Sequence, residues 1–158
     1  EAGMNIDALR SEIAADEGTK KDGNGNHIIY HDHLGLCTMG VGHLITKDDP
    51  EFDQPVGTPV SEDRVNQVFE DDIAVTLSEC RILFENFDDL PEDCQRILAN
   101  LMFNMGRPRL SKFVSMKSAI YAKDWNRAAD EIKDSKYYTQ VTNRADRLIA
   151  RMRALADG

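Results

Sequence analysis

The chain has 158 residues, 41% hydrophobic and 30% charged, which is typical of a globular protein, and it has no apolar run of the roughly 18 residues that a membrane span requires. Its three cysteines, Cys37, Cys80 and Cys94, are too few and too widely spaced for a disulfide framework or a zinc site, and they favour reduced thiols. The net charge of −9 is uneven: residues 1–94 contain 22 acidic and 6 basic side chains, whereas residues 95–158 contain 6 and 13, so an anionic partner would face the C-terminal half unless the halves simply attract each other.

The first expected element is a helix over residues 4–16, because Ile6, Leu9 and Ile13 recur at helical spacing after Asn5, a residue type that caps helices. Glu17 closes this helix and Gly18 ends it. A turn-forming run at residues 22–26 follows, and short strands are expected over residues 27–30 and 36–41. The glycines in and after the second strand, Gly40 and Gly42, are expected where backbones approach closely.

A loop rich in proline and glycine, residues 50–59, precedes a long helix that starts at the cap residue Ser61 and continues for about six turns to residue 83. From Pro91 onward the pattern predicts several shorter helices, interrupted at Gly106 and Pro108. The prediction is an α+β fold forming a single domain of residues 1–158. It has a small N-terminal lobe with an antiparallel sheet (about 14–60), a linking helix (about 61–83) and a helical C-terminal lobe (about 84–158) that packs with helix 4–16. A cleft between the lobes is the default place for a site.

Candidate chemistry begins with Glu17, Asp32 and Thr38, two carboxyl groups and a hydroxyl within one small lobe. Hydrolysis of a glycosidic bond needs one carboxyl to protonate the leaving oxygen and another to activate a water. Spacing alone carries little weight, because the 28 acidic residues of the chain produce many such pairs.

Three short motifs in a fixed order are far more specific. Asp16-Glu17-Gly18, Tyr30-His31-Asp32 and Thr38-Met39-Gly40-Val41-Gly42-His43-Leu44 resemble the active-site signature of the T-even phage lysozyme family, glycoside hydrolase family 24. The resemblance continues through residues 100–106 and 142–145. It implies a lysozyme-like fold and a muramidase that cleaves the β-1,4 bond between N-acetylmuramic acid and N-acetylglucosamine to lyse a phage host.

The resemblance also implies roles for individual residues. Glu17 would be the general acid, and Asp32 and Thr38 would hold the attacking water, giving inversion at the anomeric carbon. Glu17 would then need partial burial to stay protonated, whereas Asp32 would need water or donors nearby to stay ionised. Arg144 would ion-pair with Glu17 and position it, an interaction that opposes the effect of burial on the pKa of this acid.

Further residues fall at positions with other roles in the family. His43 and Asp72 would form a buried structural pair that ties the sheet to the long helix. Leu44, Phe103 and Asn104 would line the substrate cleft, although a phenylalanine at such a position is more often part of the core.

The sequence departs from the family in its length between the motifs. Fourteen residues separate Glu17 from Asp32 where the family usually has eight, and the extra residues are best explained by a longer hairpin within 20–29. Asp22, Asn24 and Asn26 imitate half of a calcium loop but lack its later glycine and glutamate, and His31 and His33 lack a third metal ligand. Neither a metal nor a cofactor is therefore expected.

Two alternatives stay open at this point. A lytic transglycosylase needs the acid but no water-holding carboxylate, and a non-catalytic module would bind the wall or form part of a phage tail. The expected partner is peptidoglycan, without nucleic acid or stable membrane association, and the chain is expected to be a monomer. Because residues 5–12 form an amphipathic pattern and no secretory signal, the expected location is the host cytoplasm until the membrane is permeabilised and the enzyme reaches the wall.

Overall fold

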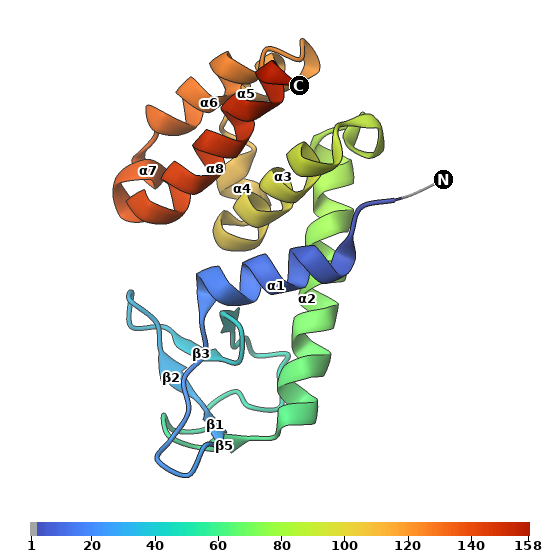
Figure 1. Cartoon of the computed structure of the whole chain (residues 1–158). Helices are drawn as coiled ribbons and strands as arrows, with labels where there is room; N and C mark the ends of the chain where they lie inside the picture. The colour runs from blue at the N-terminus through green and yellow to red at the C-terminus, as the bar shows by residue number, and fades with distance from the viewer. Residues whose placement is uncertain (1–2) are drawn as a thin grey trace. The chain divides into compact units, whose positions relative to one another are not determined.

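The chain, described here over residues 3–158 by a computed structural model, starts with helix α1 (Ile6–Glu17) (Figure 1). The Asn5 side chain accepts a hydrogen bond from the Ala8 N–H at 3.0 Å, which caps the helix as predicted. The helix begins two residues after the predicted start, and Glu17 is its last residue, as expected. Gly18, at a φ of 72°, then ends it, donating its N–H to the Ala14 carbonyl.

The strands form two small antiparallel sheets. β1 (His27–Ile28) pairs with β5 (Pro59–Val60), and β2 (Tyr30–His31), β3 (Cys37–Met39) and β4 (His43–Leu44) form a second sheet in that order. The strand predicted over 27–30 is divided at Ile29 into β1 and β2, which continues to His31, and the strand predicted over 36–41 was too long, because a turn occupies residues 40–42. β4 lies outside both predicted strands. β5 was not predicted at all, since it lies in the loop rich in proline and glycine.

The long helix α2 (Glu62–Leu83) begins where the sequence predicts, with the Ser61 hydroxyl accepting a hydrogen bond from the Arg64 N–H at 3.1 Å. Its first turns pack against the strands through a small apolar core. The buried members of this core are Ile29, Met39, Val60, Val65 and Val68. Both sheets are therefore held to one face of α2 by side chains from β3, β5 and the residue between β1 and β2.

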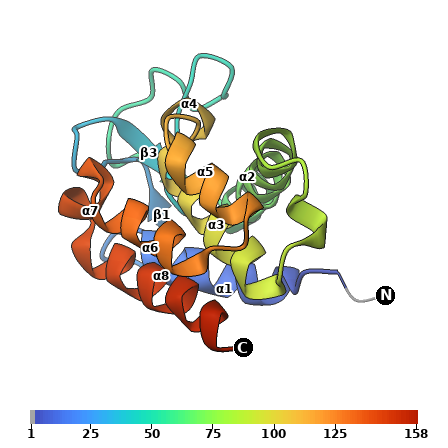
Figure 2. The ribbon, with the colours of Figure 1, turned by 90° about the horizontal axis from the view of Figure 1, so that it is seen from above.

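The rest of the chain is helical, as predicted. The elements are η1 (Phe87–Asp89), α3 (Glu92–Met105), α4 (Arg107–Leu110), α5 (Val114–Tyr121), α6 (Trp125–Lys133), α7 (Lys136–Gln140), α8 (Thr142–Ala154) and η2 (Leu155–Asp157). Gly106, at a φ of 80°, separates α3 from α4, whereas Pro108, where an interruption was also predicted, lies within the first turn of α4. Figures 1 and 2 show α6 and α8 side by side, and their facing residues, Ala129, Ile132 and Leu148 among them, are buried.

The chain divides into two compact units. We call Arg10–Val75 the strand unit, and we call the residues up to Leu9 together with Thr76–Gly158 the helical unit. Helices α1 and α2 each contribute residues to both units. Among the helices of residues 3–158, none combines the length and the apolar character that crossing a membrane requires.

Candidate active site

Glu17 is the last residue of α1 and is half-buried. Its carboxyl group lies against the turn at residues 40–42: a Cβ atom added to Gly42 would be 2.5 Å from Glu17 Oε1 and 3.1 Å from Cδ. Gly42 adopts a φ of 63°, a conformation that glycine reaches without strain. Gly42 was expected where backbones approach closely, and the group that its backbone approaches is the carboxyl of Glu17, the candidate acid.

Asp32 follows β2 and heads the tight turn that leads into β3. Its Oδ1 atom accepts hydrogen bonds from the N–H groups of Leu34 and Leu36, at 2.8 and 2.9 Å. These backbone bonds, the one from Leu36 first, lower the pKa of Asp32, and the nearby His33 and His31 act in the same direction. Within residues 3–158, neither a hydrogen bond nor an ion pair involves Oδ2, so this oxygen is available to a ligand.

The hairpin at residues 21–27 contains a turn with the same hydrogen-bonding pattern as the Asp32 turn. Asp22 Oδ1 accepts the N–H groups of Asn24 and Asn26, at 2.9 and 3.0 Å, and the fourth residue of each turn, Gly25 or Gly35, has a positive φ. Lys21 and His27 form the bridge at the base of this hairpin. The extra residues between the motifs thus form a self-contained turn. Across residues 3–158 there is also no group of three histidine, cysteine, aspartate or glutamate side chains placed to hold a metal ion.

Thr38 occupies the middle strand of the three-stranded sheet and is 3% exposed. It pairs directly with Tyr30 on one side and Leu44 on the other, so these three side chains share one face. Asp32 lies two residues beyond Tyr30, which directs it to the same face. The Thr38 hydroxyl donates its proton to the Leu36 carbonyl at 2.9 Å, and the oxygen can therefore only accept a hydrogen bond from a bound water.

Tyr30 connects the parts of this cluster. Its buried phenol donates a hydrogen bond to the Gly40 carbonyl at 3.0 Å. Burial raises the pKa of Tyr30, and the charges of Glu17 and Asp32 raise it further, although the backbone N–H of Gly42 acts in the opposite direction. Both candidate carboxylates are thus close enough to the phenol for their charges to affect it. No role for Tyr30 is predicted from the sequence beyond its place in a motif.

His43 lies at the centre of a chain of ion pairs. Its Nδ1 is 2.8 Å from Asp72 Oδ2 on α2, and its Nε2 is 2.9 Å from Asp49 Oδ2. Arg64 lies 3.5 Å from Asp49 and donates two hydrogen bonds to Glu51, at 2.8 and 3.0 Å. Partial burial opposes the charge on His43, but the carboxylates of Asp72 and Asp49 outweigh it and raise its pKa to about 9. The side chain is 18% exposed, so this network is less buried than the sequence predicted, and its Asp49 half was not foreseen.

The remaining predicted residues are distributed over both units. Leu44 is exposed on β4, next to Thr38. Phe103 and Asn104 lie half-buried near the end of α3 in the helical unit. Arg144 is buried at the start of α8 and donates from Nε to Asn100 Oδ1 at 2.8 Å. Its predicted ion pair with Glu17 would join the two units and stays a prediction.

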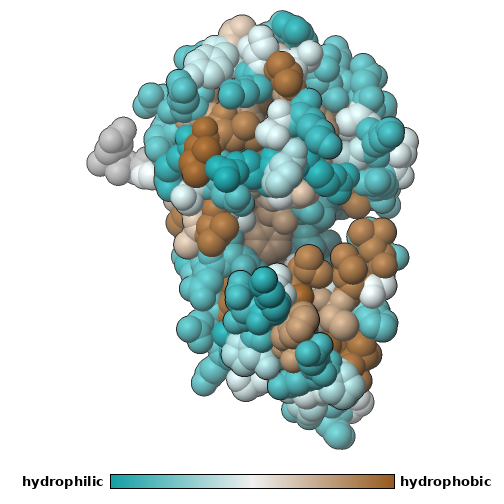
Figure 3. Space-filling model, turned by 180° about the vertical axis from the view of Figure 1, so that it is seen from behind, coloured by the Kyte–Doolittle hydropathy of each residue, from teal (hydrophilic) through white to brown (hydrophobic). Residues whose placement is uncertain are grey.

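Aliphatic side chains flank the Asp32 turn. Leu34 is 71% exposed and Leu36 is 44% exposed. Figure 3 shows hydrophobic side chains at the surface of the strand-bearing part of the molecule. The surface beside the candidate carboxylate therefore includes apolar side chains, together with the exposed His31 and His33, and the apolar ones suit contact with the apolar faces of a sugar or its acetyl groups.

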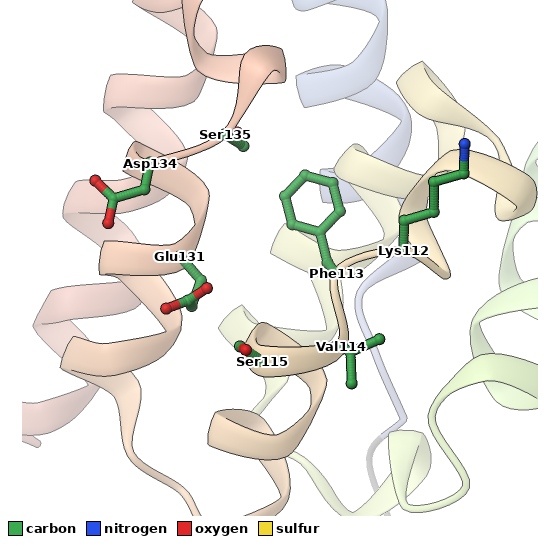
Figure 4. A pocket seen from close by; sticks show the side chains of 7 residues that line it. All are labelled: Lys112, Phe113, Val114, Ser115, Glu131, Asp134 and Ser135. Carbon is green, nitrogen blue, oxygen red and sulfur yellow. The ribbon is translucent and has the colours of Figure 1, made fainter.

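A separate pocket of about 280 Å³ lies in the helical unit, between the loop before α5 and the end of α6 (Figure 4). Its lining residues are Lys112, Phe113, Val114, Ser115, Glu131, Asp134 and Ser135. None of the predicted catalytic or binding residues lines it. The candidate site therefore rests on the cluster around Tyr30 and not on this pocket.

Comparison with known proteins gives a consistent result. The family model described as phage lysozyme matches residues 21–154, a span that includes Asp32 and Thr38 and begins shortly after Glu17. The chain is 29% identical to "Probable T4-type lysozyme 2" of Dictyostelium discoideum, over 92% of this chain and 93% of that protein. It is 25% identical to "Probable T4-type lysozyme 1" of the same organism over the same shares. It is also 28% identical to "Pre-baseplate central spike protein Gp5" of Enterobacteria phage T4, over 76% of this chain but only 24% of that protein.

Proposed function

Because the chain belongs to the phage lysozyme family, we propose that it cleaves the β-1,4 bond between N-acetylmuramic acid and N-acetylglucosamine, with inversion at the anomeric carbon. Family membership makes the protein a glycoside hydrolase that acts on peptidoglycan. The particular bond, the stereochemistry and the residues are parts of the proposal. The observation that carries them is geometric: within the strand unit, the Glu17 carboxyl lies against the 40–42 turn, Thr38 pairs with Tyr30, and Asp32 follows Tyr30 at the end of the same strand pair.

In the proposed reaction, water attacks the anomeric carbon while the bond to the leaving oxygen breaks. Glu17 gives its proton to that oxygen, and the proton lost by the water passes to the Asp32 carboxylate. Two features support the placement of the water. Asp32 has a lowered pKa and accepts hydrogen bonds when it is ionised. The Thr38 hydroxyl already donates its hydrogen bond to the Leu36 carbonyl, so its oxygen can accept one from the water. A water that donates to both groups directs a lone pair away from them, toward the sugar.

The biological role that we propose is lysis of a bacterial host at the end of phage infection. The enzyme would accumulate in the host cytoplasm and reach the wall after the membrane is permeabilised. The relatives occur in different settings, since two are named lysozymes of Dictyostelium and one is named a spike protein of a phage. The reaction and the biological role therefore require separate tests.

The reaction is tested with purified Gram-negative sacculi, incubated with the wild type or with Glu17→Gln, followed by mass spectrometry of the released muropeptides. We expect the wild type alone to release products with reducing ends, and a loss of at least about 100-fold in rate for Glu17→Gln. Proton NMR of the first product formed distinguishes inversion from retention.

Other outcomes would replace the proposal. Products with 1,6-anhydro ends would make the protein a lytic transglycosylase, in which Asp32 and Thr38 hold no attacking water. Binding to sacculi without any release by the wild type would indicate a non-catalytic wall-binding or tail module.

A further inference from the structure

The Glu17 carboxyl occupies the space that a side chain at residue 42 would need. A Cβ atom at Gly42 would lie 2.5 Å from Oε1, 3.1 Å from Cδ and 3.4 Å from Cγ of Glu17. Contacts below 3.0 Å are essentially never made by a real Cβ atom. Any residue other than glycine at this position would therefore force the Glu17 side chain to move.

This relation is specific to Gly42 among the glycines of residues 3–158 that have a positive φ. Gly40, in the same turn, faces Val65 of α2, with 2.9 Å between its added Cβ and Cγ1. Gly25 and Gly35 face open space. Gly40 thus serves packing of the turn on α2, whereas Gly42 faces the candidate acid.

The turn that carries Gly42 is anchored by Tyr30. The phenol, on β2, donates its hydrogen bond to the carbonyl of Gly40, the residue that follows the neighbouring strand β3, and it does so from a buried position. The pairing of Met39 with His43 closes the other side of the turn. Residues 40–42 are therefore held at both ends, which makes them a rigid support and not a flexible loop.

We propose that Tyr30 and Gly42 are positioning residues for Glu17. The backbone of Gly42 contacts the Glu17 carboxyl and limits where it can lie, and Tyr30 holds the turn that contains Gly42 in place through its hydrogen bond. This inference rests on the proposed role of Glu17 as the proton donor. A proton donor must lie within hydrogen-bond reach of the leaving oxygen, and a displacement of about 1 Å can lower a rate on the order of 100-fold. Because the carboxyl is the flexible end of its side chain, a methyl group at residue 42 displaces the acid, so the loss of stability comes from the positive φ of this residue and not from the contact with Glu17.

The test compares Gly42→Ala with Gly25→Ala. Both variants place a Cβ at a positive φ and therefore strain the backbone in the same way, but only Gly42→Ala contacts Glu17. We expect similar losses of melting temperature in the two variants. For Gly42→Ala, kcat on soluble glycan strands should fall about 10- to 100-fold with KM changed less than about twofold, and Gly25→Ala should retain the wild-type kcat.

Tyr30→Phe removes the bond to Gly40 and keeps the ring. We expect kcat to fall several-fold, again without a matching change in KM, and Tyr30→Leu to fall further. Equal values of kcat for Gly42→Ala and Gly25→Ala, or a wild-type kcat for Tyr30→Phe, would overturn the inference.

Crystal structures of the wild type and of Gly42→Ala separate this inference from the proposed function. An inactive wild type would end the proposed function, yet a Glu17 carboxyl displaced by about 1 Å or more in Gly42→Ala would still support the positioning role. A carboxyl in an unchanged position would overturn that role whether or not the wild type is active.

Discussion

Two aspartates of the strand unit have the same local structure and different surroundings. Asp22 and Asp32 each head a turn in which Oδ1 accepts two backbone N–H groups, and these bonds contribute to a lowered pKa in both cases. Asp32, however, shares its face of the sheet with Thr38 and lies near Tyr30, whereas Asp22 lies at the exposed tip of a separate hairpin. A stabilising role in a turn is therefore common to both, and only Asp32 has partners for chemistry.

This contrast gives a matched pair of variants, Asp32→Asn and Asp22→Asn. An asparagine keeps an oxygen that can accept the two backbone N–H groups but loses the negative charge. We expect Asp32→Asn to lower kcat at least 100-fold and Asp22→Asn to leave kcat unchanged, with small and similar changes in melting temperature. Near-normal turnover by Asp32→Asn on sacculi would remove Asp32 from the mechanism.

Residue-level patterns can be recognised in the sequence where the information lies in a short segment. Each motif around Glu17, Asp32 and Thr38 spans seven residues or fewer, so its pattern is visible in the sequence alone. The positions of Gly42 against Glu17 and of Tyr30 against Gly40 depend on how α1 meets the 40–42 turn and how β2 crosses to it. The sequence offers only a glycine and a tyrosine at these positions, without indicating what they contact.

At the scale of elements, ion pairs connect β4, the loop at residues 46–51 and α2. His43 lies on β4, Asp49 and Glu51 lie in the loop, and Arg64 and Asp72 lie on α2. The loop contributes few large buried apolar side chains, since Phe52 at its end is 47% exposed. Its position on α2 therefore depends strongly on these charges.

The network predicts how stability varies with pH. His43 has a pKa of about 9 in the folded protein and an ordinary value of 6.5, so its contribution is complete below pH 6.5 and is lost as the pH rises through 9. The difference corresponds to at most about 3 kcal/mol, less whatever the partial exposure of the side chain removes. We expect the free energy of unfolding in urea to fall between pH 6.5 and 9.5 in the wild type.

His43→Asn should be less stable than the wild type at pH 6 and should show little of this decline toward pH 9.5, with kcat nearly unchanged. His33→Asn, which removes an exposed histidine outside the network, is the control and should keep the wild-type profile. A flat profile in the wild type would mean that folding leaves the pKa of His43 unchanged.

The elements that the sequence predicts well have local signals. Asn5 and Ser61 cap helices where expected, and Gly18 and Gly106 lie at helix ends, because caps and stops depend on a few neighbouring residues. β5 was missed because its two residues pair with β1, about thirty positions earlier, and such pairing leaves no periodic pattern. The same distance in sequence separates His43 from Asp72.

At the scale of the whole chain, the charges of the two ends have opposite sign. The chain carries −9 overall, but residues 95–158 contain 13 basic and 6 acidic side chains. Several of the basic residues are engaged, as in the pairs of Arg151 with Asp93 and Arg153 with Asp130. Binding to the wall can be governed by the net negative charge of the chain or by the basic residues of its C-terminal part. These two cases give opposite signs for the salt dependence of binding.

This sign can be measured with Glu17→Gln, which we expect to bind sacculi without digesting them. If the basic residues face the anionic wall, salt screens an attraction, and the bound fraction in a sedimentation assay should fall as ionic strength rises from about 0.01 to about 0.15 M. Over this range the Debye length shortens from about 30 to about 8 Å, so charges spread over a surface are screened strongly. If the net charge dominates, salt screens a repulsion and the bound fraction rises.

We expect the bound fraction to fall with increasing salt, because screening acts on local charge and the acidic residues 1–94 need not approach the wall together with the basic ones. Unchanged binding would mean that contacts with uncharged sugar carry the affinity. The exposed Leu34, Leu36 and Leu44 would then be the first candidates for such contacts.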